Sequence, residues 1–182
     1  MILKEEEHEL RGKKILLRSA REDDADMLLD YLKTIYGETP FLTGDPDEVR
    51  LTAEDEAAYI RRSVAAEDAL MILAFVDGEY AGNCSFHGLS DRRRTKHRAG
   101  IGIALYLKCT GFGLGRLLLQ RLLQIVREQG YEQAELIVVS DNARAIHLYE
   151  SLGFRACGRI PRASKYADGT YSDDVLMVLP LE

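Results

Sequence analysis

The chain of 182 residues is poor in several residue types that mark particular classes of protein. It has no tryptophan, four prolines and three cysteines. The cysteines, Cys84, Cys109 and Cys157, are odd in number, widely spaced and without a CxxC pair, so neither a disulfide framework nor a zinc site is predicted. We expect no bound metal, and we expect the cysteines to be reduced and mostly buried.

Long apolar runs are also missing. No uninterrupted apolar stretch approaches the roughly 18 residues that a membrane span needs. The first ten residues, MILKEEEHEL, are acidic, unlike the start of a secretory signal. The sequence therefore predicts a cytoplasmic protein with no membrane partner.

The composition is that of an ordinary globular protein. The apolar fraction is 46% and the charged fraction 30%, and the length suits one domain with a substantial core. No internal repeat and no linker rich in proline or glycine divides the chain. We therefore predict a single domain over residues 1–182.

Charge is unevenly distributed along the chain, although the net charge is only −6. Residues 22–56 contain twelve acidic and two basic residues, whereas residues 91–165 contain fourteen basic and six acidic residues. Such runs are often solvated surfaces, and they can also line a cleft that holds a polyanion on one side and a cation on the other. No nucleic-acid partner is expected, because RRRTKHR is the one basic cluster in an acidic chain.

Hydrophobic periodicity predicts the element order βααβββαβαββ. Thr52 is expected to cap the second helix, and Asp77-Gly78 is typical of a tight type I′ hairpin turn. The predicted strands are 14–19, the two arms of the hairpin 71–89, 97–107, 134–140, 154–160 and 174–180, and the predicted helices are 21–36, 52–67, 117–130 and 141–154. This order predicts an α/β (α+β) fold, with a mixed, mostly antiparallel twisted sheet of six to seven strands flanked by about four helices.

A glycine-rich loop precedes the leucine-rich helix. Residues 110–116 read TGFGLGR, and a strand that leads through such a loop into a helix N-terminus suits a phosphate group. The NTPase pattern GxxxxGK[ST] is absent. The dinucleotide pattern GxGxxG also fails, because Arg116 stands at the third glycine position counted from Gly111. The loop is therefore expected to bind phosphate in another family of folds.

Two segments together resemble the GCN5-related N-acetyltransferase (GNAT) superfamily. TGFGLG at 110–115 is similar to its [QR]-x-x-G-x-[GA] loop, which binds acetyl-CoA, and NARAIHLYESLGF at 142–154 is similar to its N-x-x-A-x-x-x-Y-x-x-x-G-F helix. One helix and one strand separate them, as that fold requires. Thr110 replaces the usual Gln or Arg, and Gly100 stands where many relatives carry a glutamate that acts as general base.

The resemblance implies an acetyl-CoA-dependent N-acetyltransferase that moves an acetyl group to a primary amine by direct attack, without a metal. The cofactor-binding residues that it implies are Leu105, Tyr106, Leu107, Gly111, Phe112, Gly113, Leu114, Gly115, Arg116, Asn142 and Tyr149. Tyr149 is also the implied catalytic residue, which returns a proton to the leaving thiolate. Three structural alternatives stay open: Tyr149 is a core residue, Asn142 is a helix cap, and Arg116 is an ordinary surface residue.

The group that removes the amine proton is not identified by the sequence. An alkyl amine with a pKa of about 10.4 is almost fully protonated near pH 7, so a base is useful. With a glycine at position 100, the candidates are Asp173, Asp174 and His87, in no ranked order.

The acceptor is the second open point. In the superfamily the helices after the first strand, their connecting loop and the last hairpin wall the acceptor site, and here these segments are acidic. We therefore expect a small cationic amine, a polyamine, an amino acid or a peptide N-terminus, with Tyr36, Phe41 and Tyr171 as candidate wall residues.

Two other functions stay open on the sequence. A CoA-binding sensor that has lost the chemistry is compatible with Gly100 and Thr110, and a dinucleotide oxidoreductase is a weaker alternative. The sequence gives no oligomeric state, and a homodimer is one of the options.

Overall fold

The computed structural model describes residues 1–181 and contains eight strands and four α-helices. The strand order is β1-β2-β3-β4-β5-β6-β8-β7, and β5 and β6 run parallel. In chain order the elements are β1 (Glu6–Leu10), β2 (Lys13–Ser19), α1 (Ala25–Glu38), α2 (Ala53–Ala65), β3 (Ala69–Val76), β4 (Glu79–Gly88), β5 (Arg98–Leu105), α3 (Leu114–Glu128), β6 (Gln133–Val139), α4 (Ala143–Glu150), β7 (Arg155–Lys165) and β8 (Tyr171–Pro180).

The predicted fold class and element order are confirmed, but the strand count is not. Eight strands are present where six to seven were expected, because strand β1 precedes the predicted order. Its sequence, EEHEL, has almost no apolar residue, so hydrophobic alternation could not reveal it. β1 instead pairs antiparallel with β2, and the carboxylate of Glu6 accepts a 2.7 Å hydrogen bond from Arg121.

Two compact units divide the described chain. The first contains Met1–His87 and Gly102–Leu122, and the second contains Gly88–Ile101 and the chain from Leu123 onward. Strand β5 and helix α3 each begin in one unit and end in the other. The single domain expected over residues 1–182 stays a prediction.

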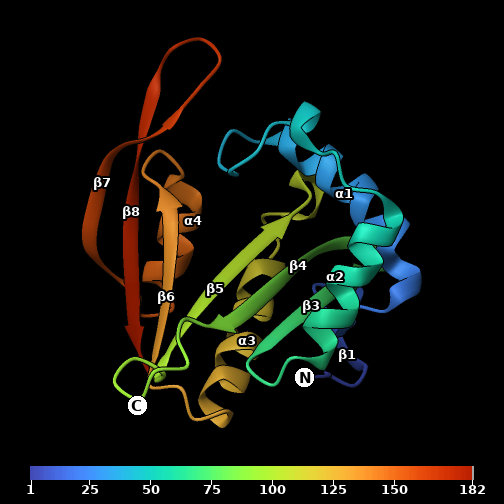
Figure 1. Cartoon of the computed structure of the whole chain (residues 1–182). Coiled ribbons are helices and arrows are strands. Elements are labelled where there is room, and N and C mark those ends of the chain that lie inside the picture. Colours follow the sequence, from blue (N-terminus) through green and yellow to red (C-terminus); the bar gives the residue numbers. More distant parts are fainter. Residues whose placement is uncertain (182) are drawn as a thin grey trace. The chain divides into compact units, whose positions relative to one another are not determined.

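In the first unit, α1 and α2 lie side by side against strands β3 and β4 (Figure 1). The core beneath them includes Tyr31 of α1, Ile60 of α2, Leu73 of β3 and Tyr80 of β4, each at most 8% exposed. Thr52 caps α2 as predicted, since its hydroxyl oxygen accepts from the Asp55 N–H. The C-terminal ends of both helices and the loop between them contact this core through Tyr36, Val64 and Leu42.

The opposite face of the same strands carries the beginning of α3. Cys84 of β4 pairs with Ile72 and so points away from Leu73, and its sulfur lies 3.8 Å from the carbonyl oxygen of Leu118. The predicted polar stripe of this helix is confirmed, because four of its residues are exposed while the leucines between them are buried, or half-buried at Leu117. The stripe consists of Arg116, Gln120, Gln124 and Arg127.

The second unit is built on β6, β8 and β7, which pair antiparallel in that order. Helix α4 ends at Glu150, and Gly153 follows with a φ of 98°, where an added Cβ would lie 3.2 Å from Leu179 of β8. β7 is longer than the predicted 154–160, and β8 starts earlier than the predicted 174–180. The added residues, 161–165 of β7 and 171–173 of β8, include few apolar side chains, so apolar periodicity did not mark this part of the hairpin.

The predicted burial of the cysteines is confirmed for two of the three. All three are free; Cys84 and Cys109 are buried and Cys157 is exposed. Within residues 1–181, no three His, Cys, Asp or Glu side chains are grouped so that they could hold a metal. None of the helices in that range is both long and apolar enough to cross a bilayer.

Candidate active site

The chain leaves strand β5 at Leu105, two residues earlier than the sequence analysis placed its end. Tyr106 donates its N–H to the Ala81 carbonyl at 3.0 Å, and residues Leu107–Cys109 then form a single 3₁₀ turn. The Leu107 N–H donates to the carboxylate of Glu38 at 2.7 Å. Because the Leu107 N–H bonds to a side chain and not to a neighbouring strand, the hydrogen bonding of the sheet does not continue past the end of β5.

The glycine loop adopts a conformation that places main-chain donors at the start of α3. Gly111 and Gly113 have φ angles of 89° and 107°, in the region that favours glycine. α3 begins at Leu114, and the Leu117 N–H donates to the Gly113 carbonyl at 3.1 Å. The N–H groups at the first turn of a helix have no acceptor within that helix, and the helix dipole is positive there. This end of α3 is therefore suited to an anion.

Side chains anchor the loop without covering it. Leu114 is 1% exposed and fixes the first residue of the helix in the core. The Thr110 hydroxyl donates to the Leu107 carbonyl at 2.6 Å, so this side chain closes the preceding turn. Gly111, Gly113 and Arg116 are exposed, and Phe112 and Gly115 are half-buried. A ligand could thus reach the loop from solvent.

A second glycine allows the close approach of β4 to the end of β5. Gly82 has φ 137°, and an added Cβ would lie 2.3 Å from the Ala104 carbonyl oxygen and 2.7 Å from Leu105 Cα. No side chain fits that space. Sequence analysis did not single out Gly82, because a lone glycine in a strand gives no sign of what approaches it.

Tyr149 lies in the second unit, on the buried face of α4, and is 7% exposed. Its ring meets that of Phe154 edge to face, with centroids 5.9 Å apart. Burial raises the pKa of the Tyr149 phenol to about 12. The hydroxyl therefore stays protonated at physiological pH, and it is a weaker acid than an exposed tyrosine.

Asn142 caps helix α4. Its side-chain oxygen accepts from the Ala145 N–H at 3.1 Å, which is the structural role that the sequence had left open for this residue. The cap uses the amide oxygen and leaves the NH₂ group as the part that could contact a ligand.

The candidate bases differ in their surroundings. Asp173 accepts 2.7 Å hydrogen bonds from the Arg162 N–H and from Arg159 Nε, and these bonds lower its pKa. His87 is exposed at the end of β4, and Asp174 is half-buried in β8. Because the charge of Asp173 is already paired, it is a weaker proton acceptor than an unpaired aspartate.

A further carboxylate lies beside Gly100 in the parallel register of β5 and β6. Glu135 is 7% exposed and accepts 2.7 Å hydrogen bonds from Arg98 Nη2 and from the Gln133 amide. The bond from Arg98 lowers the pKa of Glu135. Glu135 is the carboxylate nearest in register to Gly100, the position where many relatives carry the glutamate that acts as general base. It is thus held in an ion pair.

Three tyrosines of the first unit form a cluster that the sequence analysis did not connect. The ring centroid of Tyr31 lies 5.1 Å from that of Tyr80 and 4.9 Å from that of Tyr106, both edge to face. Glu38 lies next to this cluster, at the end of α1. The tyrosine cluster and Glu38 have no sequence signature, because these residues come from three separate segments, α1, β4 and the turn after β5.

The candidate wall residues occupy different surroundings. Tyr36 packs against Gly44, where an added Cβ would lie 2.5 Å from the ring, and Phe41 is half-buried in the same loop. Tyr171, in the second unit, carries the Arg162 guanidinium 3.8 Å above its ring centroid. The ring of Tyr171 is therefore already occupied by a cation of its own hairpin.

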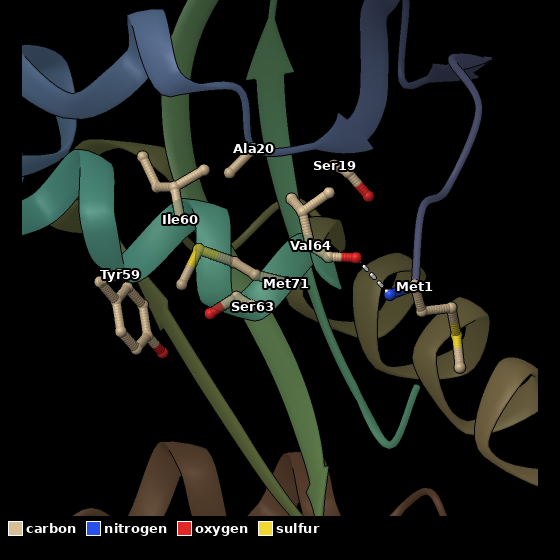
Figure 2. Close-up of a pocket in the computed structure, with 8 residues that line it drawn as sticks. All are labelled: Met1, Ser19, Ala20, Tyr59, Ile60, Ser63, Val64 and Met71. Atoms are coloured by element: carbon tan, nitrogen blue, oxygen red, sulfur yellow. Dashed lines mark hydrogen bonds between the residues drawn. The ribbon is translucent and has the colours of Figure 1, made fainter. Parts of the chain in front are cut away.

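A small surface hollow lies elsewhere in the first unit, between α2 and the strands β2 and β3 (Figure 2). The N-terminal ammonium at its edge donates to the Val64 carbonyl at 2.7 Å. Apart from this ammonium and the hydroxyl groups of its lining residues the hollow is apolar, and it contains no carboxylate, imidazole or thiol. The lining residues are Met1, Ser19, Ala20, Tyr59, Ile60, Ser63, Val64 and Met71.

Comparison with known proteins points to one family. The sequence profile of the "Acetyltransferase (GNAT) family" matches residues 29–154. A GNAT acetyltransferase of Streptococcus pneumoniae has a solved structure that covers 91% of this chain and 99% of its own, with a TM-score of 0.85 and 28% identity.

Curated relatives agree with this. The streptothricin acetyltransferase of Streptomyces lavendulae is 28% identical over 157 residues, covering 78% of this chain and 82% of its own. The mycothiol acetyltransferase of Rhodococcus opacus is 31% identical over 105 residues, which are 56% of this chain and 34% of that enzyme. The chain thus spans only about a third of the latter protein's length. Because the family profile matches more than half of the chain, and a solved member shares its fold over nearly the whole length, this chain belongs to the GNAT acetyltransferase family.

Proposed function

We propose that this protein transfers the acetyl group of acetyl-CoA to a primary amine by direct attack on the thioester. The observation that carries the proposal is the loop at Thr110–Arg116, where two left-handed glycines precede the N-terminus of α3. Family membership supports the same reaction. The named relatives acetylate different compounds, so they do not define the acceptor.

On this proposal the loop binds the diphosphate of CoA through main-chain N–H groups from Gly111 to Gly115. Arg116 is exposed in the first turn of α3 and adds a positive charge close to these donors. Leu105, Tyr106 and Leu107 are the proposed contacts of the pantetheine arm. Phe112 and Leu114 keep the loop in place, since one is half-buried and the other fully buried.

Tyr149 is the proposed acid that protonates the leaving thiolate. An ordinary thiol has a pKa of about 8.5, so a phenol with a pKa near 12 is a reluctant donor to a thiolate in water. Burial, however, raises the pKa of a thiol as well, as it does for Cys84 in the core of this protein. A thiolate formed beside a buried phenol therefore takes its proton more readily than one in solvent. Asn142 is proposed to contact the cofactor through its amide NH₂.

The decisive experiment is calorimetric titration with CoA and acetyl-CoA, followed by release of free thiol in the presence of amines. The amines are an amino acid, a diamine, an aminoglycoside and a peptide with a free N-terminus. We expect acetyl-CoA to bind with a dissociation constant below 1 mM, on the order typical of enzyme substrates, and thiol release to depend on at least one amine.

No heat of binding at millimolar acetyl-CoA would overturn the proposal. Tight binding without transfer to any amine would instead favour the sensor, the alternative that Gly100 in β5 leaves open.

A further inference from the structure

Glu38 is the last residue of α1, and its carboxylate is held in a fixed position. Its Oε2 accepts the 2.7 Å hydrogen bond from the Leu107 main-chain N–H. This bond joins the end of α1 to the turn that follows β5, although the two residues are 69 positions apart in the chain. Glu38 is half-buried, so one oxygen is occupied and the other can receive a ligand.

The side chains beside Glu38 are aromatic, and of these only the ring of Tyr106 is partly exposed. Tyr31 and Tyr106 lie edge to face with ring centroids 4.9 Å apart, and Tyr80 completes the cluster. The hydroxyl of Tyr31 is buried and has no hydrogen-bond partner within the described part of the chain, so this cluster contains an unused polar group. Burial raises the pKa of both Tyr31 and Tyr106, and the nearby charge of Glu38 adds to the increase. The phenols therefore stay neutral, and Glu38 provides the negative charge.

No basic side chain neutralises Glu38. Across residues 1–181, no Lys or Arg nitrogen lies within ion-pair distance of its carboxylate. Lys108 is the nearest basic residue along the turn, and its ammonium is bound to Glu79 at 3.1 Å. The Lys108 ammonium also lies 5.8 Å from the centre of the Tyr106 ring, near the outer limit of a cation–π contact, whereas Arg162 lies 3.8 Å from the Tyr171 ring.

The charge of the surrounding segment also favours a cationic ligand at Glu38. Residues 22–56, which contain α1, the loop and the start of α2, carry twelve acidic residues and two basic ones. A carboxylate on an amine ligand would be repelled there, while a second ammonium would be attracted.

We propose that Glu38 binds the ammonium of the acceptor, and that the ring of Tyr106 packs against its alkyl chain. The proposal names the acceptor class as alkyl diamines without a carboxylate, in which one end is held as the ammonium and the amine at the other end loses its proton and attacks the thioester, and it rests on the proposed acetyl transfer. The ammonium donates to Oε1 of Glu38, while Oε2 keeps its bond to Leu107. Glu38 is therefore a residue that binds and positions the acceptor next to the main chain at Leu105–Leu107.

The test uses two probes that differ by one group, cadaverine and lysine, which is cadaverine with an added α-carboxylate. Binding is measured by calorimetry without acetyl-CoA, and KM and kcat are measured with acetyl-CoA. We expect wild-type protein to bind cadaverine at least tenfold more tightly than lysine. If cadaverine does not bind, or if lysine binds equally well, the proposal is overturned.

Three variants separate the charge of Glu38 from its structural role. Glu38→Gln keeps an oxygen that can accept from the Leu107 N–H, so the fold should be retained while the charge is removed. We expect it to weaken cadaverine binding and to raise the KM for cadaverine at least tenfold, with the KM for acetyl-CoA within twofold of wild type. Glu38→Asp should recover part of the loss. Asp47→Asn, at an exposed carboxylate of the same acidic segment, is the matched control and should change neither constant by more than twofold.

The two proposals can fail separately. If Glu38→Gln acetylates cadaverine with wild-type constants, Glu38 is not the ammonium receptor, and the acetyl-transfer proposal survives. If wild-type protein binds cadaverine through Glu38 but acetyl-CoA gives no heat of binding, the acetyl-transfer proposal fails, and the receptor assignment is supported.

Discussion

The glycine loop at Thr110–Arg116 and the helix α4 carry the two family motifs, and they offer different parts of the chain to a ligand. The loop offers main-chain N–H groups, and its side chains up to Gly115 are small or serve as anchors. α4 offers functional groups on side chains, the amide of Asn142 and the phenol of Tyr149. The loop should therefore be sensitive to changes of backbone conformation, and the helix to changes of single atoms.

Solvent exposure separates the two regions further. Gly111, Gly113 and Arg116 are exposed, whereas Tyr149 is 7% exposed. Salt screens charges in contact with water far more than buried groups. Binding of a diphosphate at the loop should therefore weaken as ionic strength rises. The pKa of Tyr149 is set by burial, so it should not depend on ionic strength in this way.

The largest expected effect comes from a single atom of α4. Tyr149→Phe removes the phenol oxygen and preserves the ring that meets Phe154. We expect kcat to fall about a hundredfold, the lower end for general acid catalysis, with the KM for acetyl-CoA within twofold. Steady-state kinetics measures both constants. Tyr59→Phe, at a tyrosine that is 45% exposed, is the control and should leave them unchanged.

The pH profile sharpens that test. An acid works in its protonated form, so the rate falls as pH rises through its pKa. Because burial raises the pKa of Tyr149 to about 12, the wild-type kcat should not fall between pH 8 and about 10 through ionisation of this phenol. A kcat that falls with an apparent pKa near 10 in wild type and not in Tyr149→Phe would show that the phenol is not shifted.

The next effect concerns the backbone of the loop. In Gly113→Ala the added Cβ meets Leu10 only at an ordinary 3.7 Å, so the penalty comes from the φ of 107°. A left-handed conformation costs a residue with a side chain roughly 1–2 kcal/mol, and we expect acetyl-CoA to bind about tenfold more weakly. Gly12→Ala is matched in φ, at 78°, and has no neighbour within 4 Å. It should lose stability without losing affinity in the same calorimetric titration. Equal affinity in Gly113→Ala and wild type would separate the loop from CoA binding.

The smallest effect tests the two roles of Asn142. Asn142→Ala removes the cap of α4 and should lower the free energy of unfolding by about 1 kcal/mol. Asn142→Ser restores an oxygen that can cap the helix but lacks the amide NH₂. If that NH₂ contacts the cofactor, both variants bind acetyl-CoA about threefold more weakly and only the alanine variant is less stable. Denaturant unfolding and calorimetry distinguish the roles, and wild-type affinity in the serine variant would leave Asn142 with the cap alone.

Local patterns predicted well those elements whose cause lies within a few residues. Thr52 caps α2, the Asp77-Gly78 pair has φ angles of 52° and 89°, and the polar stripe of α3 is exposed. The missed strand β1 has the opposite origin. Its polar sequence gains its place from pairing with β2 and from the bond between Glu6 and Arg121, a residue 115 positions away.

The site follows the same division. The motifs at 110–115 and 142–154 identify the loop and the helix, since glycine spacing and a capped helix are local properties. Glu38 has no such signal. Its carboxylate matters because the end of α1 meets the N–H of Leu107 beside rings from three separate segments.

By itself, the sequence determined the family, the order of the helices and strands after β1, and the loop proposed to hold the diphosphate, because short-range backbone preferences and motif spacing carry that information. Tertiary structure alone decided the extra strand β1, the end of β5 at Leu105, the burial that raises the pKa of Tyr149, and the position of Glu38 without a counter-ion. The physical reason is that burial, hydrogen bonding and charge pairing depend on which distant segments come into contact, and a linear pattern does not contain those contacts.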